Sequence, residues 1–277
     1  MKFSSSALSI EVNGPIATLW LDRPEKRNAM SGELVADLPR AMAAIAEIEE
    51  LRAVIIAGRG KSFCVGIDLA SLGGFNSKVG DSGKTSGAIA NVRQMEVTRA
   101  FQAAISSVAD CPVPVIAAIH SHCLGAGVDL VTACDIRLAS ADALFGVRET
   151  KIGIVADVGT LQRLPGIVGK GQVAELAYTG KDIDAARAEK IGLVNDVYAD
   201  ADAVYAAALA MAQEIAANAP LAVRGTKFIL QQGEDLTTEQ SLLLNGLWTM
   251  ATTLNSNDLG EAMQAFMEKR PASFTGT

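Results

Sequence analysis

The stretch CLGAGVDLVTACDIRLAS, residues 123–140, decides the fold. Its glycines, Gly125 and Gly127, precede a mainly apolar run that we expect to form a short helix, and a β-rich run follows from Ile136. Free backbone N–H groups at a glycine turn and at a helix start bind negative charge. The acid Asp129 stands within the same helix start. The stretch therefore predicts a glycine turn, a helix and a strand, with anion-binding amides close to a carboxylate.

A second glycine turn, SFCVGIDLASL at residues 62–72, has the same arrangement, in which Gly66 precedes an apolar residue and the acid Asp68. Two backbone N–H groups aimed at one point form an oxyanion hole, in which each donor contributes about 3–4 kcal/mol in well-studied enzymes. Tight packing of a strand against a helix requires the same glycines. Each turn alone therefore leaves both interpretations open.

The rest of the chain alternates strands with helices. Residues 7–24 predict a β-hairpin around Asn13 and Gly14, and Ser31 is expected to cap a helix in which Pro39 causes a kink or a later start. Further expected elements are strands at 53–58 and 114–120, a helix near 92–109, a strand pair within 134–147, and helices from residue 200 onward. This order indicates an α/β protein, with a buried sheet in residues 1–200 and a helical region in residues 201–277.

The composition excludes several classes of protein. The chain has 277 residues, 49% of them hydrophobic and 20% charged, as in a globular protein with a large core. The net charge is −7 and the basic residues are scattered, so no nucleic-acid partner is expected. No apolar run approaches the roughly 20 residues needed to cross a bilayer, so no membrane partner is expected either. A metal site is not expected, because two histidines and no CxxC pair are present. We expect a cytoplasmic location for two reasons. The cysteines are expected to be reduced, and the N-terminus has no adequate apolar core for a signal peptide.

Several motifs point to other chemistry and fall short of it. GRGKS, residues 58–62, resembles the end of a phosphate-binding P-loop, but Ile55 stands where that motif needs glycine. GAGVDL, residues 125–130, lacks the third glycine of a dinucleotide fingerprint. His120 and His122 are a base or ligand pair in one interpretation, and satisfied residues at a strand end in the other. The glycine-rich residues 71–90 are expected to be either disordered or a mobile lid.

Five segments, in this order and spacing, resemble the crotonase (enoyl-CoA hydratase/isomerase) superfamily: SFCVGIDLASL, CLGAGVDLVTACDIRLAS, FGVRETKIGI, GTLQRLPGIVG and AEKIGLVNDVY. The resemblance runs from LDRPEKRNAMS to FMEKRPASF, nearly the whole chain. It implies a spiral of ββα units, a helical C-terminal trimerisation region, a homotrimer or homohexamer, and acyl-CoA thioester substrates. It implies no metal and no further cofactor, since coenzyme A belongs to the substrate.

The same resemblance assigns roles to residues. The backbone N–H groups of Ile67 and Ala126 would form the oxyanion hole for the thioester carbonyl. Ala126 replaces a glycine that many relatives carry, so the turn must accommodate a Cβ. Coenzyme A would be bound by Lys26 and Arg27, and by Lys269, which often reaches a neighbouring subunit.

The set Asp129, Glu149 and Asp157 resembles the Δ3,5-Δ2,4-dienoyl-CoA isomerases within that superfamily. The activity implied is the shift of a 3,5-dienoyl-CoA to the 2,4-dienoyl-CoA, with a proton moved from C2 to C6. One side chain does not easily span C2 to C6, roughly 5 Å apart when extended. We assign Glu149 to C2 and Asp157 to C6, an order that is open to exchange, and Asp129 to orienting a partner or tuning its pKa. Three neighbouring carboxylates repel, so at least one pKa should rise.

Other interpretations of the acids stay open. An enoyl-CoA hydratase would use Asp129 and Glu149 to add water to a 2-enoyl-CoA, with Asp157 as a bystander. A catalytically silent acyl-CoA-binding assembly protein would keep the fold alone. Asp157 lies in an apolar run, which suggests a carboxyl group buried in an acyl pocket; it also precedes GTLQRLPG, where an aspartate helix cap is worth about 1 kcal/mol.

Overall fold

The computed structural model describes residues 3–69 and 86–277. Its larger sheet has six strands in the order β1-β2-β3-β4-β6-β9, in which β1 and β2 are antiparallel and the other pairs are parallel. These strands are β1 (Leu8–Asn13), β2 (Ile16–Leu21), β3 (Ala53–Gly58), β4 (Val115–Ile119), β6 (Ile136–Ser140) and β9 (Asp196–Tyr198). A three-stranded sheet consists of β5 (His122–Leu124), β7 (Leu144–Gly146) and β8 (Asp182–Asp184). The prediction of an α/β protein is confirmed.

The hairpin and the central strands follow the sequence prediction, with one correction. Asn13 pairs with Ile16 across the tight turn, and Gly14 has a φ of +56°, which glycine adopts without strain. Residues 134–147 contain two strands, as predicted, but these strands do not pair with each other. β6 lies beside β4 and β9, whereas β7 lies beside β5 and β8 in the other sheet. Local sequence pattern gives a strand but not the sheet that it joins.

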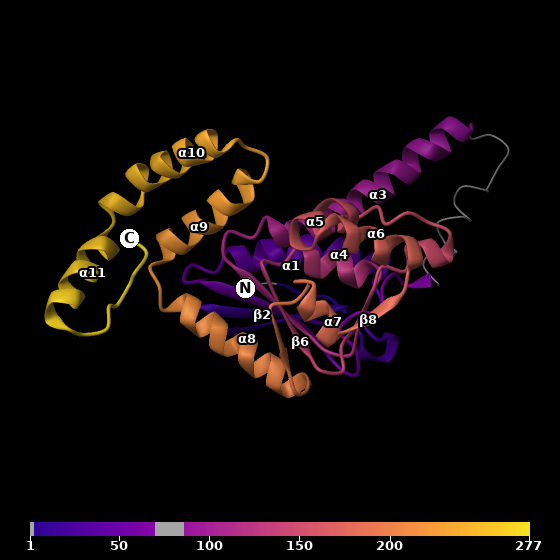
Figure 1. The fold of residues 1–277 in the computed structure, drawn as a ribbon, viewed down its shortest axis with the longest axis horizontal. Helices are drawn as coiled ribbons and strands as arrows, with labels where there is room; N and C mark the ends of the chain where they lie inside the picture. Colours follow the sequence, from indigo (N-terminus) through magenta and orange to yellow (C-terminus); the bar gives the residue numbers. More distant parts are fainter. Residues whose placement is uncertain (1–2, 70–85) are drawn as a thin grey trace.

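Helices cover both faces of the larger sheet (Figure 1). Helices α1 (Gly32–Ala46), α3 (Gly87–Ala109), α4 (Ala126–Thr132), α5 (Thr160–Ile167) and α6 (Lys170–Thr179) lie on one side, and α8 (Ala201–Ala216) lies on the other. Side chains of successive β3 residues point to opposite faces of the sheet. Ile56 belongs to the core under α1, and Ile55 belongs to the core under α8. Short helical segments complete this part: η1 (Pro24–Lys26), η2 (Glu149–Ile152) and α7 (Ala185–Lys190).

Helix α1 begins where its cap predicts. The Ser31 hydroxyl accepts the N–H of Leu34 at 3.3 Å, and the helix starts at Gly32. It continues through Pro39, so the later start expected from this proline is wrong. Pro39 cannot donate a backbone hydrogen bond, but the buried stripe of Leu34, Leu38, Met42 and Ile45 holds the helix on the core.

The C-terminal helices divide into one that packs on the sheet and three that extend from it. In Figure 1, α9 (Pro220–Gly233), α10 (Thr238–Ala251) and α11 (Asn257–Glu268) project away from the sheet, with η3 (Thr253–Asn255) between the last two. The buried Lys227 anchors α9 by donating to the carbonyl of Val113 at 2.9 Å and to the carboxylate of Asp135 at 2.7 Å.

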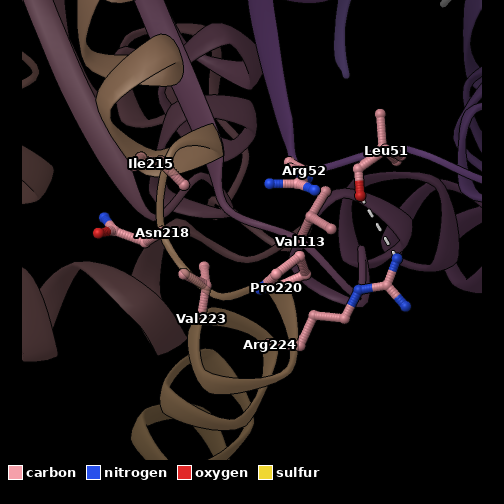
Figure 2. A pocket seen from close by; sticks show the side chains of 8 residues that line it. All are labelled: Leu51, Arg52, Val113, Ile215, Asn218, Pro220, Val223 and Arg224. Carbon is pink, nitrogen blue, oxygen red and sulfur yellow. Dashed lines mark hydrogen bonds between the residues drawn. The ribbon is translucent and has the colours of Figure 1, made fainter. Parts of the chain in front are cut away.

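The joint between the core and α9 is tightly filled. Figure 2 shows the small cavity there, about 10 Å³, with Arg224 donating from Nη2 to the carbonyl of Leu51 at 3.4 Å. Arg52 donates to the carbonyls of Ala216 and Phe274, at 2.7 and 2.5 Å. A space of this size holds about one water molecule, so the joint is a structural anchor and not a ligand site.

Two further expectations concern the glycine-rich segment and the membrane. Residues 70–85 lie outside the described part of the chain, and most of the glycine-rich segment expected to be disordered or a lid lies within them. Its last residues, 87–90, form the start of α3.

Among the described helices, none alone is long and apolar enough to cross a bilayer. Helices α8 and α9 pass that test only as a pair, with a bend of 110° between them.

Candidate active site

The two glycine turns predicted from the sequence meet in the structure. The backbones of Cys64 and Cys123, whose thiols are free, pair as an isolated parallel β-bridge that brings together the residues before the two turns. At Gly66, φ is +96°, and a Cβ placed there would lie 2.9 Å from the carbonyl oxygen of Leu124 and 3.7 Å from the backbone nitrogen of Ala126. Glycine is therefore needed at residue 66 because the second turn approaches its Cα directly.

The N–H groups of Ile67 and Ala126 are both available in the described structure. Met30 donates to the carbonyl of Gly66 at 2.8 Å and accepts from the N–H of Asp68 at 2.9 Å, so the Ile67 N–H points away from Met30. Ala126 is the first residue of α4, where the N–H has no partner within the helix. Within residues 3–69 and 86–277, no recorded hydrogen bond uses either N–H. The two neighbouring turns thus present two free amide donors.

Gly125 places a carboxyl group beside these donors. Its φ of 51° and ψ of −121° lie outside the regions that other residues adopt. A Cβ at this position would lie 3.2 Å from Oε1 of Glu149. The Glu149 carboxyl group therefore faces the residue that immediately precedes the Ala126 donor.

Glu149 is a buried acid with an altered proton affinity. It lies in η2, is 8% exposed, and its Oε2 is buried without a hydrogen-bond partner among the described residues. Burial raises the pKa of Glu149 to about 7, and the charges of Asp129 and Asp157 act in the same direction. A carboxyl group with this pKa exchanges protons readily at neutral pH.

Asp129 links α4 to the start of α5. It is fully buried in the first turn of α4, and its Oδ1 accepts the backbone N–H of Thr160, the first residue of α5, at 2.5 Å. Its Oδ2 is buried and has no partner among the described residues. Burial raises the pKa of Asp129, the hydrogen bond from Thr160 opposes that rise, the charge of Asp157 adds to it, and Arg163 opposes it.

Asp157 lies near the other two acids but not in the environment expected. It is exposed, as are its apolar neighbours Ile152, Ile154 and Val155, so the expectation of a buried carboxyl group is wrong. Ile152 ends η2, and Ile154 and Val155 lie in the loop after it, where all three face outward. The residues on either side of Asp157, Ala156 and Val158, are buried in the core. The cap of α5 is Gly159 and no side chain caps it, so the interpretation of Asp157 as a helix cap is also wrong. Its charge raises the pKa of both Asp129 and Glu149, which places the three carboxyl groups in one electrostatic cluster.

An apolar cavity of about 440 Å³ opens between α1 and α3 and reaches Ile67. Its lining is Met30, Ser31, Gly32, Val35, Ala36, Pro39, Ile67, Val97, Ala100, Phe101 and Ala103. The sequence does not predict this cavity, because helices far apart in the chain form it. Its position beside one of the two free amides makes it a suitable site for the apolar part of a ligand.

The basic residues expected to bind coenzyme A occupy two separate places. Lys26 and Arg27 are exposed next to η1, where Asn28 fixes the chain by donating to the carbonyls of Arg59 and Ser62, at 2.9 and 2.8 Å. Lys269 is exposed at the end of α11, and Figure 1 shows α11 far from α4 and α5. A single chain therefore does not bring Lys269 to the acid cluster.

Several polar residues around the cluster were not predicted from the sequence. Gln102 donates from Nε2 to the carbonyl of Asp157 at 2.6 Å, and Arg163 donates from Nη2 to Oγ of Ser106 at 2.9 Å. Arg163 is visible in the motif GTLQRLPG, but its partner Ser106 lies 57 residues away in the sequence. Local sequence pattern therefore does not predict their contact. These contacts tie α3 to both ends of the segment that carries Asp157.

The histidines and thiols have ordinary structural partners. His120 contacts the carbonyl of Gly60 at 3.1 Å, and His122 contacts the hydroxyl of Ser121 at 2.8 Å. Burial raises the pKa of Cys64 to about 12 and that of Cys123 well above its ordinary value, so neither thiol is ionised near neutral pH.

The chain is similar to known proteins over most of its length. The model of the enoyl-CoA hydratase/isomerase family matches residues 11–277. The chain is 41% identical to the mitochondrial Δ(3,5)-Δ(2,4)-dienoyl-CoA isomerase of Dictyostelium discoideum, covering 94% of this chain and 87% of the relative. It is 39% identical to the peroxisomal Δ(3,5)-Δ(2,4)-dienoyl-CoA isomerase of Arabidopsis thaliana, covering 92% and 91%. An enoyl-CoA hydratase from Bacillus anthracis superposes with a TM-score of 0.86 at 31% identity, covering 98% of this chain and all of the other.

These relatives correct the expected location. The similar isomerases of Dictyostelium discoideum, Mus musculus and Homo sapiens are named mitochondrial, which conflicts with the cytoplasmic location inferred from the sequence, and that inference is wrong. Its physical basis was too weak, because free cysteines separate reducing from oxidising compartments and do not distinguish among the reducing ones.

These solved structures confirm the predicted spiral fold. The family and the named relatives confirm that the protein is an enzyme. The converging glycine turns, the fold and the match over residues 11–277 lead to one conclusion: the chain belongs to the enoyl-CoA hydratase/isomerase, or crotonase, family.

Proposed function

We propose that this enzyme converts a 3,5-dienoyl-CoA to the 2,4-dienoyl-CoA. The observation that carries the proposal is the position of the Glu149 carboxyl group at Gly125, next to the free Ala126 amide, with Asp129 and Asp157 close enough that their charges raise the pKa of Glu149. Relatives named dienoyl-CoA isomerases, at 39–41% identity over most of the chain, support it.

The first step is removal of a proton from C2. The thioester oxygen accepts the two N–H groups, which stabilise the negative charge that develops on it. Polarisation of the carbonyl makes the C2 proton acidic, and Glu149 takes it to leave a dienolate. The position of Glu149 supports this role, because its Oε1 faces Gly125, next to the Ala126 donor, and C2 is bonded to the carbonyl carbon. A pKa of about 7 suits a base that acts at neutral pH.

The second step is delivery of a proton to C6 by Asp157. The electron pair released at C2 shifts the two double bonds along the chain, and the new C–H bond forms at C6. The exposed position of Asp157 supports this assignment, because a carboxyl group in contact with water regains its proton from solvent after each turnover. Glu149 loses its proton in the same interval, so the cycle closes without net proton uptake. The reaction relocates one proton and two double bonds without net oxidation or reduction, and therefore needs no redox cofactor.

Asp129 acts on the other two acids without touching the reacting carbons. Its hydrogen bond to the Thr160 N–H fixes the start of α5, and with it the segment that carries Asp157. Its charge also raises the pKa of Glu149. Both effects support an orienting and tuning role for Asp129.

Coenzyme A binding and assembly form a second part of the proposal. The apolar cavity beside Ile67 takes the apolar part of the substrate, and Lys26 and Arg27 bind its phosphates. We assign Lys269 to coenzyme A bound by a neighbouring copy, since α11 lies far from the acid cluster of its own chain. The helical region, residues 201–277, would join copies into a homotrimer or a pair of trimers. Its large exposed apolar side chains support this: Leu230, Leu236, Leu242, Leu243, Leu247, Met250, Leu254, Leu259, Met263, Phe266 and Met267.

A direct assay tests the proposal. The enzyme is incubated with a 3,5-dienoyl-CoA and, separately, with a 2-enoyl-CoA, and the ultraviolet spectrum is followed. Formation of the conjugated 2,4-dienoyl-CoA as the faster reaction is expected. Hydration of the 2-enoyl-CoA alone would favour a hydratase, an activity named for several solved structures at 29–31% identity. Turnover of neither substrate at stoichiometric enzyme would favour a silent acyl-CoA-binding protein.

A further inference from the structure

Arg163 folds back over the beginning of its own helix. Its Nη1 fills the space above Gly159, where a Cβ would lie only 1.9 Å from that nitrogen. Its backbone N–H donates to the carbonyl of Gly159 at 2.9 Å, within the first turn of α5. The guanidinium thus lies against the peptide that leads into Thr160, whose N–H holds the carboxylate of Asp129.

Helix α3 holds this arrangement from outside. Ser106 accepts from Nη2 of Arg163 at 2.9 Å, and Gln102, one turn earlier on α3, donates to the carbonyl of Asp157 at 2.6 Å. The neighbouring Ala104, Ile105 and Val108 are buried and fix this part of α3 on the core. The guanidinium therefore lies against the start of its own helix and donates a hydrogen bond to a hydroxyl on a separate, anchored helix.

The place is electrostatically unfavourable for a cation unless anions compensate it. The first turn of a helix carries positive partial charge, which repels an arginine. The compensating anion is Asp129, whose carboxylate accepts the N–H of Thr160, the residue that follows Gly159. Arg163 accordingly lowers the pKa of Asp129 against the effect of its burial. The other titratable groups that act on or with Asp129 are Asp157, Glu149 and the thiols of Cys64 and Cys123. Both thiols stay protonated, and the residues that α3 contributes next to Arg163 and Asp157 are the uncharged Ser106 and Gln102.

We propose that Arg163, held by Ser106 against the backbone of Gly159, is a positioning residue that keeps Asp129 ionised, so that the exchangeable proton of the cluster is carried by Glu149. The inference rests on the proposed function for its meaning in catalysis, but the distribution of protons among the acids is a property of the unliganded protein. Arg163 touches no reacting atom in this account and acts through Asp129.

Three variants and one control test the inference. Arg163→Met removes the cation and keeps much of the apolar stem, Arg163→Lys keeps a charge, and Ser106→Ala removes the outer contact. The control is Arg187→Met, because Arg187 also joins two helical segments, by donating from Nη2 to the Gln172 side chain at 2.7 Å, and its carboxylate partner is Glu175 and not Asp129 or Glu149. Carboxyl titrations are followed by carbon-13 NMR, with Asp129→Asn and Glu149→Gln to assign the signals, and melting temperatures report on folding.

The expected titrations have a definite direction. In Arg163→Met the Asp129 signal titrates at higher pH, and that of Glu149 at lower pH because a protonated Asp129 no longer repels its charge, each by about 0.5–1 pH unit. Ser106→Ala shifts both in the same directions by less, Arg163→Lys restores them toward wild type, and Arg187→Met leaves them unchanged. Unchanged titrations in a folded Arg163→Met protein would overturn the inference.

The kinetic consequence separates this inference from the proposed function. If the enzyme isomerises a 3,5-dienoyl-CoA, Arg163→Met should lower kcat by about tenfold, change KM little, and move the acidic limb of the pH profile to lower pH. A uniform loss of activity with an unmoved pH profile would indicate a structural role only and would contradict the inference. If the wild-type enzyme does not isomerise the substrate, the proposed function fails, and the NMR titrations still decide the role of Arg163.

Discussion

The carboxylate of Asp129 accepts the backbone N–H of Thr160 at 2.5 Å, a contact that joins the first turn of α4 to the first turn of α5. The N-terminus of α4 carries the Ala126 donor, and the residues before α5 carry Asp157. One buried hydrogen bond therefore fixes the distance between the amide that would bind the thioester and the acid that would serve C6.

Asp129→Ala removes this contact, whereas Asp129→Asn keeps an oxygen that accepts the Thr160 N–H. A side chain that accepts a hydrogen bond at a helix start is worth about 1 kcal/mol, so the alanine variant should be less stable than the asparagine variant by about that amount. Denaturant unfolding of both proteins measures the difference. Equal stability of the two variants would show that the contact does not hold α5.

Ala126→Pro tests the oxyanion hole at one of its donors. Residue 126 is the first of α4, a position where proline is favoured and where the lost N–H has no helical partner. The substitution should lower kcat by about 10²–10³-fold, as removal of one oxyanion donor does elsewhere, while the melting temperature changes little. Ala126→Ser, which keeps the N–H, is the matched control and should retain most of the activity. An active proline variant would remove Ala126 from the site.

Glu149 predicts opposite effects of pH on activity and on stability. A base with a pKa of about 7 must be deprotonated, so kcat/KM should fall as the pH falls below about 7. The folded-state pKa lies above the ordinary value of 4.5, so between these values the folded protein binds more protons than the unfolded chain. The free energy of unfolding should therefore decrease as the pH rises through this window, and level off above it.

Glu149→Gln separates the two effects. The variant should lose the acidic limb together with most of the activity, and at pH 8 it should be more stable than the wild type by about 1–2 kcal/mol, because no charge is buried. Urea unfolding at pH 5 and pH 8 gives the comparison, and the gain should vanish at the lower pH. A variant that is less stable than the wild type at pH 8 would contradict the burial of an ionised Glu149.

The sequence predicted what local chemistry determines. The turn at Asn13 and Gly14, the cap at Ser31 and the two glycine turns all depend on residues close together in the chain, and the structure has them where they were expected. The convergence of Ile67 with Ala126 came from the family resemblance, since nothing in either turn alone specifies the other.

The errors share a physical cause, which is that contacts distant in sequence decide exposure and pairing. The apolar run before Asp157 suggested burial, but Ile152, Ile154 and Val155 face outward and only Ala156 of that run is buried. The apolar cavity needs both α1 and α3, and the contact of Arg163 with Ser106 spans 57 residues. The sequence pattern within a short window shows whether a residue is polar or apolar, but it does not show against which element that residue packs.

The central claim, that two different acids serve C2 and C6, is tested most directly with Asp157→Asn and a 3,5-dienoyl-CoA in D₂O. The measurement follows deuterium at C2 by NMR and formation of the 2,4-dienoyl-CoA by absorbance. Because Glu149 is intact in this variant, deuterium should still enter C2, while product should form at least about 10²-fold more slowly than with the wild type. Hydration of a 2-enoyl-CoA, measured in parallel, controls for the integrity of the oxyanion hole and of the pair Asp129 and Glu149. Isomerisation at the wild-type rate, or loss of exchange at C2 together with isomerisation in a folded variant, would contradict the assignment of Glu149 to C2 and Asp157 to C6.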